Sequence, residues 1–264
     1  MQYCRFQSQD GPAYGLVEDR GGELVVTASF VSLESSDRAT IIPPATLNTL
    51  SLLSPVTPTK IVCVGRNYRD HAKELGNDVP AEPLLFYKPP SSLLTPGGIV
   101  LMPKASERVD FEGELAVIIA KRARKLKHDQ DLSAYIHGFT LANDVTARDL
   151  QKKDGQWARA KGFDTFCPVG PIVNTEISLS EIESGLTIET HVNGELRQHG
   201  STADFIFSLP VLLEYITAAI TLEPGDLLLT GTPAGVGPLK SGDEVTISIP
   251  GLGQLSNTFQ REED

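Results

Sequence analysis

The sequence predicts a mostly β protein with short helices, which places it in the α+β class. Three observations lead to this prediction. Short apolar segments rich in β-branched residues recur along the chain, and clusters of Gly, Pro, Asn and Asp separate them. Asn193-Gly194 joins two such segments and is the strongest short-range signal for a β-hairpin in the chain. The helical patterns are brief, and the clearest of them covers residues 211–220.

Length and charge narrow the class of protein. With 264 residues and 40% hydrophobic residues, the chain can form one large domain or a main domain with a small appendage. The formal net charge of −11 argues against binding to nucleic acid or to an anionic membrane surface. No apolar run approaches the roughly 18 residues that a membrane-spanning helix needs.

The cysteines and the N-terminus indicate a cytoplasmic location. The three cysteines, Cys4, Cys63 and Cys167, are far apart and show neither a metal-binding nor a disulfide spacing. Such usage fits a reducing compartment. The first residues lack the basic and then apolar pattern of a signal peptide.

The first 55 residues are predicted to form a small N-terminal β domain and a linker. Short strands are separated there by turn residues such as Gly21-Gly22, and no catalytic residue types cluster. A stretch punctuated by prolines follows. We therefore predict a second, metal-dependent catalytic domain over residues 56–264.

The first chemically suggestive segment follows an apolar strand that ends at Gly65. A short helical segment then runs to about Gly76, and it carries His71 and Glu74 three positions apart, hence on one face. A carboxylate beside an imidazole fixes the ring tautomer and makes the histidine a better base. The alternative is an exposed helical ion pair of little consequence.

Glu112 and Glu114 begin another apolar strand, and side chains two apart in a strand point to the same face. Asp144 stands at the end of a further predicted strand. Three acids that converge at strand ends form an oxygen-rich site for Mg²⁺ or Mn²⁺. A solvated strand edge carrying two glutamates is the simpler alternative.

The segment after Asp144 is predicted to pass from a strand into a helix, which would put Asp144, Arg148 and Gln151 on one face. An acid, a cation and an amide within reach of each other suit an anionic, chelating substrate. Lys161 is flanked by small residues, so it is either a buried ammonium or a surface lysine in a loop. Lys88, at the end of a strand stopped by prolines, either faces an anion or lies on the surface.

The second half adds a helix, a loop and a closing hairpin. Ser208 is the predicted cap of the helix over residues 211–220. The glycine-rich loop that follows residue 229 looks like a phosphate cradle but lacks the Lys-Ser/Thr of a Walker motif. Gly231 and Thr232 are candidates to offer backbone N–H groups and a hydroxyl to a carboxylate.

Together these segments resemble the fumarylacetoacetate hydrolase family, and the resemblance covers residues from about 60 to 260. Several motifs match in the expected order, which makes the set far more specific than any member. The matching motifs are Val64-Gly65-Arg66-Asn67-Tyr68 with His71-x-x-Glu74, Glu112-x-Glu114, Asp144-Val145-Thr146-Ala147-Arg148-Asp149-Leu150-Gln151, Lys161-Gly162-Phe163-Asp164 and Leu229-Thr230-Gly231-Thr232-Pro233.

The resemblance implies a role for each matched residue. It implies that Glu112, Glu114 and Asp144 bind a divalent metal, Mg²⁺ or Mn²⁺, and that His71 and Glu74 form a dyad that activates water. It implies a lysine beside the metal at Lys161. The residues that it implies for substrate binding are Arg66, Arg148, Gln151 and Thr232. It also implies a rolled, sandwich-like β fold and a homodimer.

The expected function is that of an enzyme acting on a small 2-oxo acid. The leading reading is metal-dependent hydrolysis of a C–C bond in acylpyruvate-type 2,4-dioxo acids through a metal-bound enolate. The alternative is an oxaloacetate decarboxylase, or a tautomerase or isomerase of 2-oxo and enol acids, on the same site. A sugar-acid dehydratase and a non-catalytic binding module are further readings. The sequence does not choose between Mg²⁺ and Mn²⁺.

Overall fold

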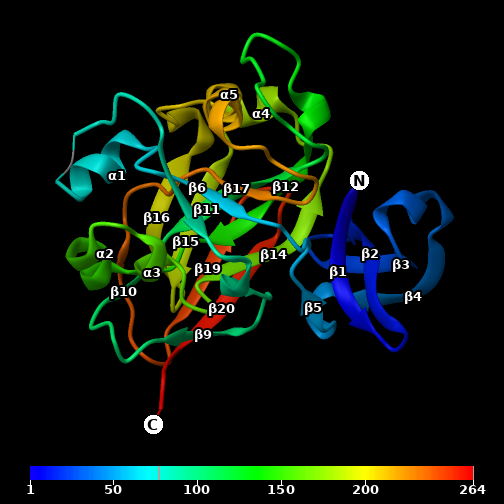
Figure 1. Ribbon diagram of the computed structural model, residues 1–264. Helices are drawn as coiled ribbons and strands as arrows, with labels where there is room; N and C mark the ends of the chain where they lie inside the picture. Colours follow the sequence, from blue (N-terminus) through cyan, green and yellow to red (C-terminus); the bar gives the residue numbers. More distant parts are fainter. Residues whose placement is uncertain (77, 264) are drawn as a thin grey trace.

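A computed structural model describes residues 1–76 and 78–263 and shows a mostly β protein with short helices (Figure 1). The largest sheet has 12 strands in the order β4-β3-β2-β1-β14-β12-β11-β17-β6-β7, with β5 beside β1 and β8 beside β14. Its strands are β1 (Gln2–Ser8), β2 (Gly11–Asp19), β3 (Leu24–Phe30), β4 (Thr40–Thr46), β5 (Leu52–Leu53), β6 (Ile61–Gly65), β7 (Leu84–Lys88), β8 (Leu93–Leu94), β11 (Gly113–Ile119), β12 (Ile136–Asn143), β14 (Cys167–Asn174) and β17 (Leu227–Leu229).

Two smaller sheets and several short helices complete the fold. A five-stranded sheet consists of β16 (Glu195–Ser201), β15 (Thr187–Val192), β19 (Glu244–Ser248), β20 (Gln254–Arg261) and β9 (Ile99–Met102). A three-stranded sheet consists of β13 (Thr146–Ala147), β10 (Val109–Phe111) and β18 (Gly237–Pro238). The helices are α1 (Arg69–Glu74), α2 (Arg148–Asp154), α3 (Ala158–Lys161), α4 (Leu179–Ser184) and α5 (Leu209–Ala219). None of the described helices is long and apolar enough to cross a membrane.

The 12-stranded and the five-stranded sheet enclose the main core. Leu115, Val117 and Ile119 of β11 lie in one buried cluster with residues of β15 and β19, whereas Ala116 and Ile118 lie in a second cluster. β11 is therefore buried on both faces, which explains its unbroken apolar run. This rolled, sandwich-like arrangement confirms the predicted fold class.

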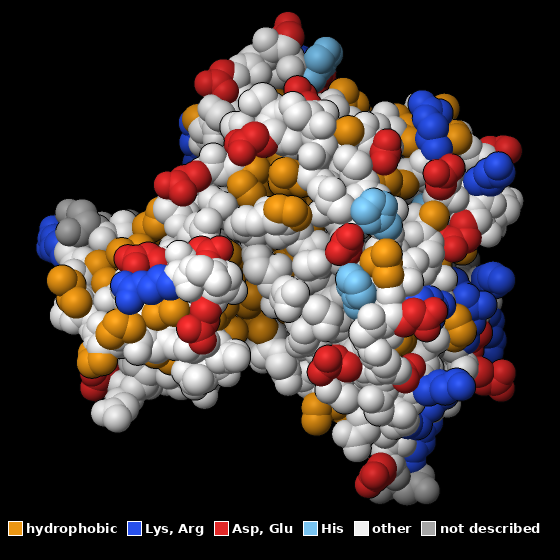
Figure 2. All heavy atoms as spheres, turned by 180° about the vertical axis from the view of Figure 1, so that it is seen from behind, with side chains coloured by type: hydrophobic (Ala, Val, Ile, Leu, Met, Phe, Trp, Pro, Cys, Tyr) orange, Lys and Arg blue, Asp and Glu red, His pale blue; other side chains and the backbone are white. Residues whose placement is uncertain are grey.

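The N-terminal strands form a lobe to one side of the molecule (Figure 1). β1 nevertheless pairs with β14, with Tyr3 opposite Val173, so the lobe continues the large sheet. Seen from behind, the lobe and the body are separated by a hollow, and acidic and basic side chains are intermixed on this face (Figure 2). A cavity of about 980 Å³ is lined from the lobe by Leu24 and Leu50 and from the body by Ile249. The proposed domain boundary at residue 55 stays a prediction.

The predicted turns and helix cap can be compared with the structure directly. Asn193 and Gly194 have φ of 51° and 81°, the backbone of a type I′ turn, and the hairpin of β15 and β16 is confirmed. The closing hairpin of β19 and β20 is also confirmed. Ser208 does stand at the N-cap of α5, but its side chain makes no capping hydrogen bond, so that part of the prediction is wrong.

The site lies where several neighbouring strands of the large sheet begin or end, on one side of that sheet along the strand direction. Gly113 pairs with Asn143, and the Asp144 backbone N–H donates to the Glu112 carbonyl at 2.9 Å. β17 pairs antiparallel with β11 and parallel with β6, so the segments that follow Leu229 and Gly65 emerge at the same end of the sheet as the start of β11.

Candidate metal centre and active-site cavity

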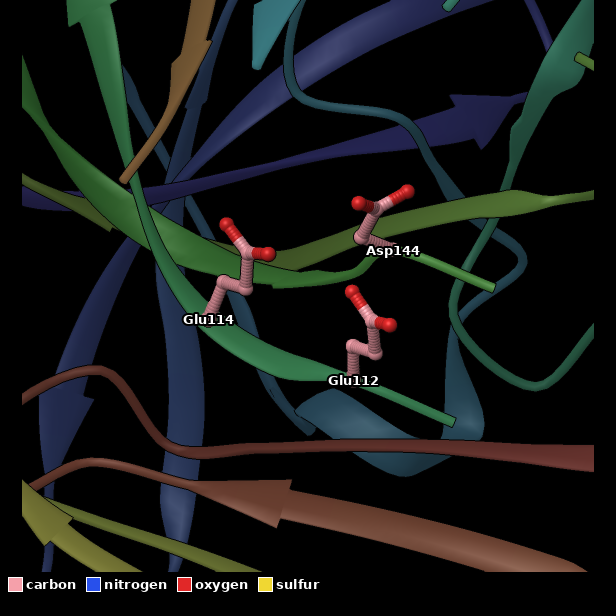
Figure 3. A group of neighbouring side chains, drawn as sticks. All are labelled: Glu112, Glu114 and Asp144. Atoms are coloured by element: carbon pink, nitrogen blue, oxygen red, sulfur yellow. The ribbon is translucent and has the colours of Figure 1, made fainter. Parts of the chain in front are cut away.

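Three buried carboxylates converge where these strands begin or end. Glu112, Glu114 and Asp144 each offer an oxygen, and these oxygens lie within 4.8 Å of one another. Figure 3 shows the three side chains pointing toward a common space, two from the start of β11 and one from the end of β12. Each residue is at most 4% exposed. The convergence predicted from the Glu-x-Glu spacing is therefore present.

Glu112 and Glu114 experience opposite electrostatic environments. Burial raises the pKa of Glu112, but the charges of Lys161 and Arg148 outweigh burial and hold the pKa well below its ordinary value. Burial and the neighbouring charges of Asp144 and Glu112 raise the pKa of Glu114 well above its ordinary value. Glu114 receives a single backbone hydrogen bond, from Gly231 N–H at 2.7 Å. A carboxylate in this position needs a proton or a further cation, so the donor set fits a hard divalent ion.

Two buried lysines donate hydrogen bonds to carboxylates of the triad. Lys161 Nζ donates to Glu112 Oε2 at 2.8 Å and to Asp144 Oδ2 at 2.5 Å, and lies 5.0 Å from the centre of the Phe86 ring. Lys88 Nζ donates to Asp144 Oδ1 at 2.6 Å and to the Val145 carbonyl at 3.1 Å. Lys161 and Lys88 are both buried, so the alternative of a surface position is wrong for each of them.

Arg148 connects the triad to a fourth buried acid. Its guanidinium donates to Asp110 Oδ2 at 2.8 Å, to Gln151 Oε1 at 2.7 Å and to Glu112 Oε1. Arg148 and Gln151 share a face of α2, as predicted, but Asp144 does not lie on this helix, because β13 intervenes. Asp144 approaches Arg148 through the fold and not through helical periodicity.

His71 and Glu74 lie on α1 beside the triad. His71 Nδ1 is 3.3 Å from Glu74 Oε2. His71 is only 4% exposed whereas Glu74 is exposed, so the pair is part-buried and not a fully solvated ion pair. Burial raises the pKa of Glu74, but hydrogen bonds from His71 and from the Gly235 N–H outweigh it and lower the pKa. Gly235 has a φ of 107°, and a Cβ there would lie 2.0 Å from the Arg197 carbonyl oxygen, so glycine is required.

The loop after β17 serves the protein's own groups. The Gly231 N–H donates to Glu114, and Thr232 Oγ1 donates to the Gly113 carbonyl at 2.9 Å while accepting from Gln198 Nε2 at 2.7 Å. The expectation that Gly231 offers its N–H to a carboxylate is confirmed, and that carboxylate is Glu114 of the site itself. The Thr232 hydroxyl donates to a backbone carbonyl instead, so that part of the expectation is wrong. Thr232 still lines the cavity.

A cavity of about 490 Å³ brings all the sequence-predicted residues together. Its lining includes Arg66, His71, Glu74, Glu112, Glu114, Asp144, Arg148, Gln151, Lys161 and Thr232. Sequence reasoning left Lys88 undecided and missed Asp110 and Asn67, which are fully buried and bonded to site residues or site loops. The position of Lys88 at the end of a strand was the one available signal.

A family model described as the C-terminal domain of fumarylacetoacetate (FAA) hydrolase matches residues 60–260 of this chain. The chain is 44% identical over 223 residues to the oxaloacetate tautomerase YisK of Bacillus subtilis, covering 80% of this chain and 73% of the relative. It is 38% identical over 287 residues to the mitochondrial oxaloacetate tautomerase FAHD2B of Bos taurus, covering 97% and 91%.

Solved structures agree with the sequence comparison. The crystal structure of a protein described as 5-carboxymethyl-2-hydroxymuconate delta-isomerase from Mycobacterium smegmatis superimposes with a TM-score of 0.86. That similarity covers 100% of both chains at 37% identity. The motifs, the acidic triad, the fold and these comparisons agree, and the chain belongs to the fumarylacetoacetate hydrolase family.

Proposed function

We propose that this chain is a divalent-metal-dependent enzyme that interconverts the keto and enol forms of a small 2-oxo acid such as oxaloacetate. The convergence of Glu112, Glu114 and Asp144 inside a cavity that also holds a histidine base carries this proposal. The relatives named as oxaloacetate tautomerases, and the structural neighbour described as an isomerase, support this reaction class.

Glu112, Glu114 and Asp144 are the residues that would hold Mg²⁺ or Mn²⁺. A bound divalent ion supplies Lewis-acid polarisation of the 2-oxo carbonyl of the substrate. Lys161 adds a fixed positive charge at the edge of the triad, where it offsets negative charge that develops on the substrate. Burial of the site strengthens this electrostatic effect, because water does not screen it.

Proton transfer falls to His71. The Glu74 carboxylate accepts a hydrogen bond from Nδ1 of His71 and so fixes the orientation of the imidazole ring. This leaves Nε2 as the nitrogen that can take a proton from carbon 3 of the substrate and return it. The Gly235 N–H holds Glu74 in turn, at 3.1 Å from Oε1. The dyad is therefore positioned by a loop that also donates to a carboxylate of the triad.

C–C hydrolysis of an acylpyruvate-type 2,4-dioxo acid is the second candidate. The observation that favours it is the same His71–Glu74 pair, since a histidine with a carboxylate partner can also deprotonate a water molecule. Decarboxylation of oxaloacetate needs neither an attacking water nor removal of a carbon 3 proton, so it requires no base; the enolate left by loss of CO₂ only takes up a proton. The dyad therefore favours tautomerisation and hydrolysis over decarboxylation.

The experiment that tests the proposal measures two reactions on one preparation. Enol decay of oxaloacetate and pyruvate release from acetylpyruvate are followed with Mg²⁺ and then with excess EDTA. We expect metal-dependent tautomerisation that His71→Ala lowers by about 100-fold or more, with Lys73→Ala on the exposed face of α1 as the matched control. Metal-dependent pyruvate release without faster enol decay would reject tautomerisation and establish the hydrolase.

The expected homodimer stays a prediction. Light scattering on the eluting protein measures the mass directly, and a mass of one chain would contradict it.

A further inference from the structure

The cations that line the cavity divide into two groups. Arg108 donates to both Asp110 oxygens, and Arg148 and Lys161 are bonded to carboxylates as described above. Arg66 and Lys152 also line the cavity, and within residues 1–76 and 78–263 the side chain of neither makes a hydrogen bond or ion pair to another residue. Lys152 is exposed, whereas Arg66 is half-buried. A half-buried guanidinium without a protein partner is unusual and suits an anionic ligand.

The backbone holds Arg66 in place at the cavity. Its φ of 57° lies in the left-handed region, which costs a non-glycine residue about 1 kcal/mol or more. The next residue, Asn67, is fully buried, and its amide bonds the carbonyls of Phe207 and Thr230 at 3.2 and 2.9 Å. Strain of this kind persists where the surroundings fix it, and it is concentrated at ligand sites.

The charges of the site leave room for a second anionic group. The site holds four buried acids and four basic side chains. Asp110, Glu112 and Asp144 are bonded to these bases, whereas Glu114 accepts the Gly231 N–H. The acids are Asp110, Glu112, Glu114 and Asp144, and the bases are Lys88, Arg108, Arg148 and Lys161. Glu74, Arg66 and Lys152 also line the cavity, and together these three side chains add one net positive charge. A divalent ion adds two positive charges, of which the carboxylate of a 2-oxo acid cancels one.

We infer that Arg66 is a specificity-determining residue that binds a second carboxylate of the substrate and so selects dicarboxylic over monocarboxylic 2-oxo acids. The inference rests on the proposed function and names the substrate class of that site. A guanidinium can bind a carboxylate through two parallel, charge-assisted hydrogen bonds. A methyl ester has no charge to assist such bonds, and a methyl group has no acceptor atom. A cavity of about 490 Å³ has room for a small dicarboxylate with its waters.

The test measures binding by calorimetry in the presence of Mg²⁺. The probes are 2-oxoglutarate, its C5 methyl ester, which removes the distal charge, and oxalate, which reports on the triad alone. The wild-type protein is expected to bind 2-oxoglutarate about tenfold or more tightly than the ester. Arg66→Gln should abolish this preference and leave the oxalate affinity within about twofold, while Arg66→Lys should keep part of the preference.

Two matched controls separate the possible outcomes. Arg69→Gln removes an exposed arginine of α1 that does not line the cavity, and it should leave every affinity unchanged. An undiminished preference in Arg66→Gln, or a loss of preference caused by Lys152→Gln in its place, would overturn the assignment of Arg66. Oxalate binding with Mg²⁺ in that case would leave the proposed function standing. Absence of oxalate binding to the wild-type protein would reject the proposed function and the inference with it.

Discussion

Replacing Glu114 by Gln is expected to change stability in opposite directions with and without metal. Glu114 lies among two other carboxylates and accepts one N–H at 2.7 Å. Burial, and then repulsion by Asp144 and Glu112, raise the pKa of Glu114. The amide carries no charge that burial or repulsion could disfavour, so in EDTA Glu114→Gln should be at least as stable as the wild type. In Mg²⁺, the variant has lost a ligand, and its stability should no longer rise with the metal.

The size of the second effect follows from linkage. At a Mg²⁺ concentration of 100 times the dissociation constant, binding stabilises the wild-type protein by about 2.7 kcal/mol. If the lost ligand weakens binding by about 100-fold, the same concentration stabilises the variant by only about 0.4 kcal/mol. For a chain of this length, the wild-type melting temperature should therefore rise by roughly 5–10 °C on addition of Mg²⁺, and that of the variant by about 1 °C.

Thermal unfolding monitored by circular dichroism, with and without Mg²⁺, measures both effects. Glu107→Gln is the matched control, because Glu107 is an exposed carboxylate on the same segment and does not line the cavity. Equal Mg²⁺-induced shifts in Glu114→Gln and the wild type would refute the assignment of Glu114 as a metal ligand. A marked loss of stability in EDTA would refute the account of its electrostatics.

Three further predictions concern the supports of the site and of the sheet. Lys88→Met should lower the free energy of unfolding by about 3–5 kcal/mol, because it leaves Asp144 Oδ1 buried without its ammonium partner; urea unfolding at pH 7 measures this, and a loss below 1 kcal/mol would contradict it. Gly231→Ala should cost roughly 1–3 kcal/mol, because Gly231 has a φ of 100° and a Cβ would lie 2.8 Å from Asn67 Cβ; unchanged stability would contradict it. Burial raises the pKa of Asp226, but stronger hydrogen bonds lower it below 3.8; the donors are Thr59, Lys60 and Glu223. The stabilisation from Asp226 is thus present above pH 4 and lost as the pH falls further. Asp226→Asn should therefore be less stable than the wild type at pH 7, and its stability should fall less with acid. Urea midpoints of the two proteins that stay a constant distance apart from pH 7 to 3 would contradict this.

Local patterns in the sequence predict much of this molecule. The type I′ turn at Asn193-Gly194 depends only on backbone conformations that those two residues favour. The shared face of Glu112 and Glu114 follows from the period of a strand, and the pairing of His71 with Glu74 follows from the period of a helix. Each of these features lies within a few residues, where one rule of geometry decides the outcome.

Contacts between distant residues account for what the sequence leaves open. Lys88 reaches Asp144 across 56 positions, and Arg148 reaches Asp110 across 38, so no local periodicity reveals either pair. The short strand β13 follows Asp144 because Asp110 pairs with Thr146, and this pairing overrides the predicted continuation into a helix. Burial of Lys161 likewise depends on the carboxylates that the fold brings to it.

The measurement that tests the central claim most directly is exchange of the carbon 3 protons of oxaloacetate with deuterated solvent, followed by nuclear magnetic resonance. Removal of a carbon 3 proton is the defining step of tautomerisation, and exchange reveals it without any cleavage of a C–C bond. The account predicts exchange above the spontaneous rate with Mg²⁺, its loss in excess EDTA, and its loss in His71→Ala. Exchange at the spontaneous rate, from protein that binds Mg²⁺ at Glu112, Glu114 and Asp144, would contradict it.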